Sequence, residues 1–365
     1  MSMKTIIYME SSEKFGGQEM QIVAQMDELR LRNWQPILLC NYTSEVGTYA
    51  EKTNHKIKRI NLRNSFDISG ILETYKILKQ LKPSAIVVHS GHDSSIGVIA
   101  SYCYRFLNHE NLKIIRIRTY QPGKPKAFHY NHLYDVTFTP SFFLRESLLK
   151  NKKINSIKIS EMYPGINFQK IDEDANLKLP RFIDNWINDN PGPLIVHGAM
   201  LRGEKGHSFF LDILQKIKIK WPNIRYIIAG SGEEHDLIYS KIRILGLEDN
   251  VLLAGLVNPI APLIKKATIA VLPSIKEPLG MFQIESQYLQ IPTIANEVDG
   301  IPETIEKNVT GLLVKPYQES WVEAISWALE NKQKLQQLAD NGRNFVINKF
   351  CIKKNIETLI SAIES

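Results

Sequence analysis

Short apolar segments alternate with amphipathic helical patterns along almost the whole chain, and this alternation narrows the folds that the sequence can adopt. In the first half, strands are expected at 6–9, 36–39, 57–60, 85–89, 114–118 and 136–139. In the second half, they are expected at 194–197, 225–229, 251–253, 269–272, 293–295 and 312–314. Helical patterns separate them, for example at 19–31, 70–81 and 94–106. Strands that alternate with helices form parallel sheets covered by helices on both faces, so we predict an α/β protein.

The length of 365 residues suits about two domains of ordinary size. The polar stretch 167–189 is expected to connect them. We predict two Rossmann-like domains, 1–165 and 166–345, whose sheets face each other across a cleft. The last segment, 346–365, is expected to be a helix that packs back on the first domain. Ligands of such sheets bind beyond the carboxyl ends of the strands.

The composition, with 44% hydrophobic and 23% charged residues, is that of an ordinary globular protein. Its cysteines, Cys40, Cys103 and Cys351, are few, odd in number and widely spaced, which favours reduced thiols and offers no zinc motif. Neither a signal peptide nor an apolar run of ~18 residues is visible. We expect a cytoplasmic protein, free or peripheral on the inner face of the plasma membrane.

The net charge of +7 is unevenly distributed. Residues 1–165 carry 23 Lys and Arg against 14 Asp and Glu, whereas the remainder carries 22 against 24. Basic residues cluster at 56–59, 124–126 and 150–153. Such clusters either form a solvated surface or attract an anionic membrane or a phosphate-bearing acceptor. Nucleic acid is a poorer choice of partner, because no recognition motif accompanies the charge.

Two carboxylates, Glu277 and Glu285, flank a loop-to-helix junction. Pro273 ends the strand before Glu277, and Glu285 is expected in the second turn of the next helix. Backbone N–H groups at the start of that helix would suit a phosphate, and the carboxylates would suit sugar or ribose hydroxyls. The pattern therefore suggests a nucleotide-sugar site, although either glutamate alone is also typical of a protein surface. The residues expected to bind the donor here are Glu277, Leu279, Gly280, Met281, Phe282 and Glu285.

Arg202 and Lys205 lie in the loop after the strand at 194–197. Arginine offers a planar fork of donors and lysine a mobile point charge, so this loop suits a diphosphate. These cations would stabilise the negative charge that develops on a departing nucleoside diphosphate. The alternative is a solvated basic turn.

Further segments follow in a recognisable order: Gly230-Ser-Gly232, Gly246 to Gly255, Gly300-Ile-Pro-Glu303 and Thr310 to Val314. With the paired glutamates, they resemble glycosyltransferase family 4, and the resemblance covers nearly the whole chain. Gly16-Gly17-Gln-Glu19 before a helix resembles the glycine loop of that family. The resemblance implies the GT-B fold and metal-independent transfer that retains the anomeric configuration. It also implies a UDP- or GDP-sugar donor and a glycan or polyprenyl-diphosphate-linked acceptor, in synthesis of bacterial surface polysaccharide or lipopolysaccharide.

The same resemblance assigns roles to individual residues. Glu277 would contact the transferred sugar, Glu285 the ribose and Lys205 the diphosphate, with the departing phosphate taking the proton of the acceptor. Arg202 would replace an arginine that many relatives carry where this chain has Met200. The remaining residues expected to bind the donor are Gly16, Gly17, Gly198 and Gly230. No cofactor and no metal is expected, and Asp172-Glu-Asp174 is interpreted as solvated acid rather than as a metal motif.

Candidates for contact with the acceptor or the sugar follow two strands of the first half. His89 is either a buried core histidine or a ligand contact, and Asp93 could cap a helix that begins near Ser94. Relatives often carry a histidine after the next strand, where this chain offers Arg118 and Gln121. Lys124 begins a loop that mixes cations with aromatic residues and is expected to face an acceptor or a membrane.

Two other functions remain open at this point. A nucleotide-sugar epimerase could share this fold, although Lys205 and the two glutamates favour a transferase. A binding protein with two lobes and no catalysis would usually be exported, and the expected signal peptide is missing.

Overall fold

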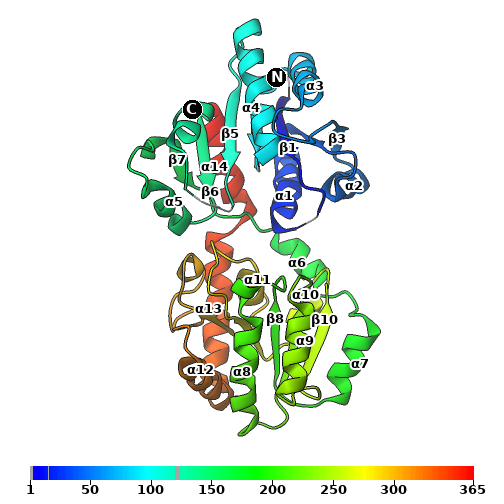
Figure 1. Ribbon diagram of the computed structural model, residues 1–365, viewed down its shortest axis with the longest axis vertical. Coiled ribbons are helices and arrows are strands. Elements are labelled where there is room, and N and C mark those ends of the chain that lie inside the picture. The colour runs from blue at the N-terminus through cyan, green and yellow to red at the C-terminus, as the bar shows by residue number, and fades with distance from the viewer. Residues whose placement is uncertain (1–2, 15, 90, 120–123) are drawn as a thin grey trace. The chain divides into compact units, whose positions relative to one another are not determined.

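The computed structural model describes residues 3–14, 16–89, 91–119 and 124–365. The chain forms two compact units. Unit 1 comprises Met1–Ile166 and the C-terminal Phe350–Ser365, and unit 2 comprises Asn167–Lys349. Each unit is a parallel sheet with helices on both faces, as the alternation of strands and helices predicts (Figure 1).

The described strands of unit 1 form a seven-stranded parallel sheet in the order β3-β2-β1-β4-β5-β6-β7. Side chains alternate along each strand, so that Ile6 and Tyr8 of β1 face α1, α2 and α14, whereas Ile7 and Met9 face α3 and α4. The strands are β1 Lys4–Glu10, β2 Trp34–Cys40, β3 Lys56–Arg59, β4 Ala85–Val88, β5 Lys113–Ile117, β6 Val136–Thr139 and β7 Ile159–Glu161. The helices are α1 Gly17–Leu31, α2 Glu45–Lys52, α3 Ile68–Leu81, α4 Gly91–Asn108, α5 Phe142–Leu149 and α14 Ile352–Glu364, with short turns η1 His129–Leu133 and η2 Ser156–Lys158.

The described strands of unit 2 form a six-stranded parallel sheet in the order β10-β9-β8-β11-β12-β13. Helices α8, α9 and α12 cover one face around Phe210 and Trp321, and α7, α10 and α11 cover the other around Leu263. The strands are β8 Leu194–Gly198, β9 Arg225–Ala229, β10 Val251–Gly255, β11 Ile269–Leu272, β12 Thr293–Asn296 and β13 Leu312–Val314. The helices are α6 Phe168–Asp174, α7 Arg181–Asp189, α8 His207–Lys218, α9 His235–Ile244, α10 Ala261–Ile264, α11 Phe282–Tyr288, α12 Gln318–Glu330 and α13 Lys332–Lys349, with short turns η3 Gly203–Lys205 and η4 Ile301–Glu303.

The stretch 167–189, which its polarity suggests as the connector between the domains, is already part of unit 2. It contains the whole of α6 and α7. Asn167 begins α6 because its side-chain oxygen accepts a hydrogen bond from the Lys170 N–H at 3.1 Å, which satisfies a free donor of the first turn. Helix α7 buries Ile183 fully against the sheet, so a single apolar contact face is enough to fix a mostly polar helix.

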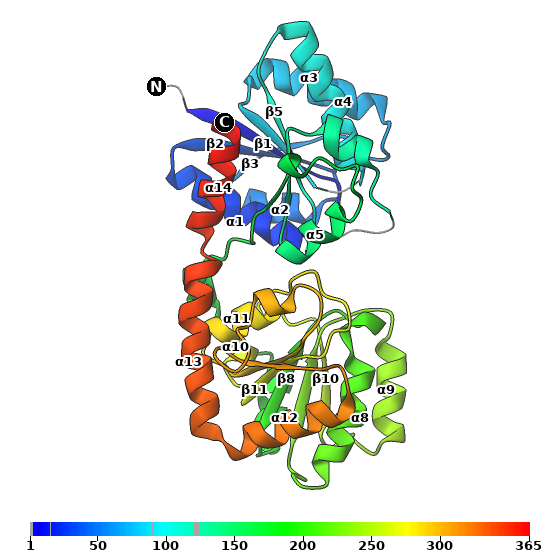
Figure 2. The ribbon, with the colours of Figure 1, turned by 90° about the vertical axis from the view of Figure 1, so that its left-hand side faces the viewer.

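The C-terminal residues complete unit 1. Helix α14 lies beside α1, as Figure 2 shows. The buried Gln25 Nε2 donates to Asn355 Oδ1 at 2.9 Å, across 330 positions of sequence. Asn355 Nδ2 in turn donates to the Tyr163 carbonyl at 2.7 Å. The C-terminal helix therefore completes the cover that α1 and α2 form over one face of the N-terminal sheet.

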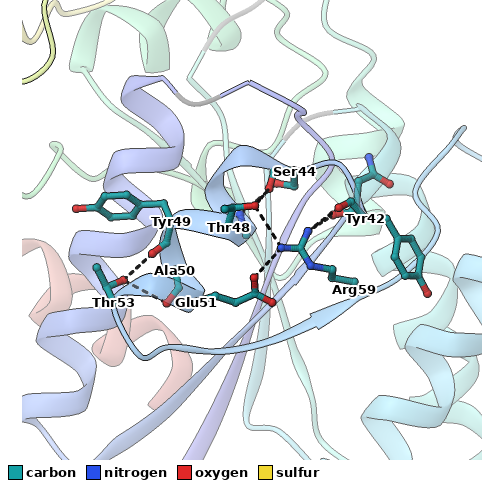
Figure 3. Close-up of polar contacts among 10 residues, drawn as sticks. Tyr42, Ser44, Thr48, Tyr49, Ala50, Glu51, Thr53 and Arg59 are labelled. Atoms are coloured by element: carbon teal, nitrogen blue, oxygen red, sulfur yellow. Dashed lines mark hydrogen bonds and ion pairs between the residues drawn. The ribbon is translucent and has the colours of Figure 1, made fainter.

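Arg59 fixes the outer part of unit 1 rather than standing free in the basic segment 56–59. Its guanidinium donates to the Tyr42 carbonyl at 2.6 Å and to Glu51 Oε2 at 2.9 Å (Figure 3). A weaker contact reaches Thr48 Oγ1 at 3.4 Å. These bonds hold together the end of β3, helix α2 and the loop before it, so part of this basic cluster has a structural role.

Both sheets reverse their strand order at one place. The chain runs outward from β1 to β3 and then returns to place β4 beside β1, and β11 lies beside β8 in the same way. At such a point the two loops that follow the central strands leave in opposite directions, and ligands of α/β sheets bind there. No helix of the described residues combines the length and apolar character needed to cross a bilayer.

Candidate active site

Lys205 and Glu277 meet where the strand order of unit 2 reverses. Lys205 ends the η3 turn after β8, and Glu277 lies in the loop after β11. Lys205 Nζ lies 2.6 Å from Glu277 Oε2, although the two residues are 72 positions apart. Their side chains are only 19% and 11% exposed. The fold thus brings together the cation and the carboxylate that the sequence predicts for a sugar diphosphate.

The burial of this pair decides what it can do. Exposed ion pairs contribute little because water screens them, whereas a pair partly withdrawn from water interacts more strongly. A backbone hydrogen bond from the Ile275 N–H to the Glu204 carbonyl, at 2.8 Å, joins the two loops directly beside the pair. The cation can contact an anionic oxygen and the carboxylate can accept from a hydroxyl within one small site.

Glu285 lies in the first turn of α11, not in the second turn as the sequence predicts, because the helix begins only at Phe282. The residue as a whole is partly exposed. Burial, and next the charge of Asp174, raises the pKa of Glu285 to about 7. Near neutral pH this carboxyl group is therefore partly protonated.

The glycines predicted to bind the donor have packing roles that the structure makes visible. A Cβ atom on Gly198 would lie 2.4 Å from Ile260 Cδ1, and one on Gly230 would lie 1.9 Å from the Ala199 carbonyl oxygen. Gly280 has a φ of 87°, a backbone conformation that residues with a side chain rarely adopt. Leu279 and Phe282 are buried, and Met281 precedes the first residue of α11. The glycines at 198 and 230 thus let the loops at the strand ends pack closely.

Two histidines that sequence reasoning missed lie beneath the loop that carries Arg202 and Lys205. His197 and His207 are fully buried, with ring centroids 4.1 Å apart. His207 Nε2 lies 3.1 Å from the Met200 carbonyl, which fixes the loop just before the exposed Arg202. Burial lowers the pKa of His207 to about 4, so this ring is neutral at physiological pH.

In unit 1, the glycine loop is fixed by a carboxylate. Glu19 Oε2 accepts a hydrogen bond from the Gly16 N–H at 2.8 Å, at the start of α1. A Cβ atom on Gly17 would meet nothing within 4 Å, so open space lies over this glycine. Gly16 is thus bonded to the helix that it precedes, and Gly17 is accessible.

The structure favours the core interpretation of His89. The ring is buried, and its Nδ1 lies 3.1 Å from the Met9 carbonyl, which can only accept, so the neutral ring carries its proton on Nδ1. Burial lowers the pKa of His89. Asp93 is not a helix cap, because α4 already begins at Gly91. Instead, its carboxylate accepts from the His89 N–H at 2.7 Å and from Ser11 Oγ at 3.1 Å.

A buried carboxyl group, Glu10, lies at the end of β1 and was not predicted. Gln18 Nε2 donates to Glu10 Oε2 at 2.6 Å, and Thr119 Oγ1 donates to Gln18 Oε1 at 2.7 Å. Burial, then the nearby charge of Asp93, raises the pKa of Glu10 to about 8. A glutamate that ends an otherwise apolar strand was the available signal in the sequence.

The other candidates in unit 1 are less tightly defined. Arg118 directly follows β5 and is half-buried, and burial followed by the charge of Arg116 lowers its pKa. Lys124 is exposed. Gln121 lies outside the described residues.

The acidic segment 172–174 is part of α6, where Asp172 and Glu173 are exposed and two of the three carboxylates also have protein partners. Tyr288 donates its hydroxyl hydrogen to Asp172 Oδ2 at 2.6 Å, and Lys170 pairs with Asp174 at 2.5 Å. Over the described ranges, no group of three or more His, Cys, Asp or Glu side chains is arranged to hold a metal ion.

Replacing Glu10 with glutamine is expected to change how stability depends on pH. Because the folded pKa of about 8 lies above the ordinary value of 4.5, the folded protein keeps a proton that the unfolded chain releases. The free energy of unfolding should therefore fall as pH rises between these values. Between pH 5 and pH 8, the free energy of unfolding of the unaltered protein should fall by more than about 1 kcal/mol relative to that of Glu10→Gln. Urea unfolding of both proteins across this range measures the difference, and parallel curves would contradict it.

Comparison with known proteins finds similar sequences over most of the chain. Residues 181–345 match the family model described as glycosyl transferases group 1. The capsular polysaccharide biosynthesis glycosyltransferase CapM of Staphylococcus aureus is 24% identical over 346 residues, which cover 89% of this chain and 88% of CapM. An Escherichia coli UDP-Gal:alpha-D-GlcNAc-diphosphoundecaprenol alpha-1,3-galactosyltransferase is 20% identical over 326 residues, 80% of this chain and 78% of that enzyme.

Solved structures identify the fold. Anabaena Alr3699/HepE, crystallised with UDP and glucose, matches with a TM-score of 0.82 and 17% identity, over 99% of each chain. The predicted GT-B fold, with two parallel-sheet Rossmann-like units, is thereby confirmed. The family match and the relatives support a glycosyltransferase.

Proposed function

We propose that this protein is a retaining, metal-independent glycosyltransferase of family 4. It moves a sugar from a UDP- or GDP-sugar to a glycan or polyprenyl-diphosphate-linked acceptor, in the synthesis of a bacterial surface polysaccharide or lipopolysaccharide. The observation that carries this proposal is the pairing of Lys205 with Glu277 at the β8–β11 reversal of unit 2. CapM is named as a glycosyltransferase of capsular polysaccharide biosynthesis, and the E. coli relative is named as a galactosyltransferase that acts on a diphosphoundecaprenol-linked sugar. The HepE structure contains UDP and glucose. These names and ligands support the proposal.

Each residue of the site has a separate role in the proposed transfer. The bond between the anomeric carbon and the diphosphate oxygen breaks, and the acceptor oxygen bonds to that carbon from the same face. The departing phosphate oxygen takes the acceptor proton, so no side-chain base is needed. Lys205 and Arg202 stabilise the charge on the diphosphate, and the Glu277 carboxylate stabilises positive charge at the anomeric carbon. Glu285 accepts from the ribose hydroxyls. In unit 1, open space lies over Gly17, so a ligand can approach the protein backbone closely there.

The test combines binding with product analysis. UDP- and GDP-sugars are screened for thermal stabilisation, because a ligand that binds only the folded protein raises its melting temperature. We expect one donor to stabilise the protein and to release its nucleoside diphosphate when an acceptor is added, with the anomeric configuration retained. Conversion of the sugar without release of diphosphate would instead establish an epimerase. No stabilisation by any donor would overturn the proposal.

We further propose that unit 1 binds an anionic membrane at the cytoplasmic face. Residues 350–365 add two lysines and two glutamates to unit 1, so this unit retains the whole positive excess of the chain. Asn151 Nδ2 donates to the Pro125 carbonyl at 2.8 Å, which joins the two basic segments 124–126 and 150–153. The exposed lysines on these segments are Lys124, Lys126, Lys150, Lys152 and Lys153.

Apolar side chains accompany these lysines. Phe128 is 63% exposed and Ile157 is 86% exposed, and each lies a few positions along the chain from a basic segment. Large apolar groups beside cations suit the interface between lipid headgroups and acyl chains. This basic surface fits an acceptor that is anchored in a membrane.

Charge reversal at Lys152 and Lys153 is expected to weaken vesicle binding. Each lysine near an anionic surface contributes about 1 kcal/mol, so the double change to glutamate should lower affinity by at least tenfold. Co-sedimentation with vesicles containing phosphatidylglycerol measures it, at rising salt. The matched control is the same reversal at Lys76 and Lys79, exposed on α3 of the same unit. Equal losses in both variants, or equal binding to neutral vesicles, would contradict a specific surface.

A further inference from the structure

The end of β12 and the residues directly after it, 296–300, form hydrogen bonds to the loop that carries Glu277. Asn296, the last residue of β12, is fully buried. Its Nδ2 atom donates to two successive carbonyls of that loop, Pro273 at 2.9 Å and Ser274 at 3.0 Å. Both hydrogens of one amide group are thus used to fix the backbone three to four residues before Glu277.

Trp321 fixes the orientation of the Asn296 amide. The Trp321 Nε1 atom donates to Asn296 Oδ1 at 2.8 Å, from the fully buried face of α12. An indole N–H can only donate, so the oxygen of the amide must face Trp321 and the NH2 group must face the loop. The position of the loop is therefore set from inside the packed core of unit 2.

Glu277 itself is held by the same segment. Its backbone N–H donates to Asp299 Oδ2 at 3.0 Å, and its carbonyl accepts from the Gly300 N–H at 3.0 Å. A Cβ atom on Gly300 would lie 1.9 Å from the Pro278 carbonyl oxygen, so the two backbones are in direct contact. Both backbone polar groups of Glu277 are bonded to residues 299 and 300.

We propose that Asn296 and Asp299 are positioning residues that place the Glu277 carboxylate opposite Lys205. The inference rests on the proposed function, since it concerns the same site. A carboxylate that stabilises positive charge at a reacting carbon must be held to within a fraction of an ångström, and a displacement of about 1 Å can cost roughly 100-fold in rate. Four hydrogen bonds from 296–300 supply that constraint on the backbone, and Lys205 supplies it on the side chain.

Asn296→Asp is the main test. An aspartate has the same shape and still accepts from Trp321, but it offers at most one hydrogen in place of the two that hold Pro273 and Ser274. We expect kcat for sugar transfer to fall more than about tenfold. The affinity for the free nucleoside diphosphate should change less than about threefold, because that competitor lacks the sugar that Glu277 contacts.

Asn250→Asp is the matched control. The buried Asn250 also donates from Nδ2 to two backbone carbonyls, Pro222 at 2.9 Å and Ile224 at 2.7 Å, ahead of β10 in the same unit. The change therefore removes the same two hydrogen bonds from an amide group, at a place remote in sequence from the loops that carry Lys205 and Glu277. We expect a similar fall in melting temperature and a kcat within about twofold of the unaltered protein, since only general stability is affected.

Asp299 supplies an independent pair of variants if Asn296→Asp fails to fold. Asp299 has a φ of 49°, which asparagine and glycine both adopt readily. Asp299→Asn keeps an oxygen for the Glu277 N–H and should keep nearly full kcat. Asp299→Gly removes that oxygen and should lower kcat about three- to tenfold, with faster hydrogen exchange at the Glu277 amide.

Separate results decide the two proposals. If Asn296→Asp lowers kcat no more than Asn250→Asp does, or Asp299→Gly matches Asp299→Asn in kcat and amide exchange, the positioning role is overturned. If the unaltered protein releases no nucleoside diphosphate from any donor, the proposed function fails instead, and the amide exchange at Glu277 still reports whether the loop is held.

Discussion

Lys205→Ala is expected to lower the rate of sugar transfer about 10- to 150-fold, the largest effect of any single substitution in the site. A hydrogen bond to a charged group contributes about 1.5–3 kcal/mol, and in the proposed function Lys205 makes this bond to a diphosphate whose charge grows as the sugar leaves. The loss should appear in kcat at saturating donor, measured as release of nucleoside diphosphate. An unchanged kcat in a folded variant would show that the loop after β8 does not bind the diphosphate.

The control for Lys205→Ala is Lys241→Ala. Lys241 Nζ lies 2.8 Å from Asp212 Oδ2, so this pair has nearly the same geometry and lies in the same unit, between α8 and α9. Its loss should leave kcat unchanged.

Combining Lys205→Ala with Glu277→Gln tests the ion pair itself, because removing the lysine alone leaves the largely buried carboxylate without its cation. The double variant should therefore lose less free energy of unfolding than the sum of the losses in Lys205→Ala and Glu277→Gln.

Glu277→Gln and Glu285→Gln are expected to affect different kinetic constants. In the proposed function, Glu277 contacts the sugar, whose charge and position change during the reaction, so its loss should lower kcat. Glu285 is proposed to contact the ribose, which is bound alike before and during reaction, so its loss should mainly raise the donor KM. Competition by the free nucleoside diphosphate should weaken in Glu285→Gln and hardly change in Glu277→Gln. The reverse pattern would exchange the two roles, and no effect from either would remove the glycosyltransferase proposal.

The pKa of Glu285 adds a pH test to this pair. With a pKa of about 7 in the unliganded site, the group becomes a full acceptor for ribose hydroxyls only as pH rises above that value. Donor KM should therefore fall between pH 6 and pH 8 in the unaltered protein. In Glu285→Gln this part of the pH dependence should be absent, because an amide does not titrate in that range.

Local sequence patterns predicted most strands because runs such as 269–272 are rich in apolar residues and are bounded by proline or glycine. Strand β7 was missed because Ile159–Glu161 has three residues and only one buried side chain. Helix α7 was missed because the polar composition of 167–189 was given more weight than its apolar residues at 183, 186 and 187, which lie at helical spacing. The first error comes from an element too short to have a local pattern, and the second from judging a segment by composition instead of periodicity.

The candidate site was predictable in its residue types but not in its contacts. Lys205 and Glu277 were each identified from the loop after a strand, yet their 2.6 Å separation depends on which strands lie side by side. Asn296 and Asp299 escaped notice because they act on backbone groups of another loop, which no local pattern encodes. Glu10 was overlooked because a burial-induced pKa shift depends on the packing of distant segments.

The placement of α14 in unit 1 has a consequence for synthesis on the ribosome. Proteins usually fold from the N-terminus as domains emerge, at about 5–20 residues per second. Here Ile356 and Leu359, which pack with α1 and α2 on one face of the first sheet, are made after the whole of unit 2. Unit 2 is contiguous, and all of it is translated before α14. The unit that begins first therefore lacks α14 on one face of its sheet until unit 2 has been translated, and α1 and α2 alone can cover that face in the meantime.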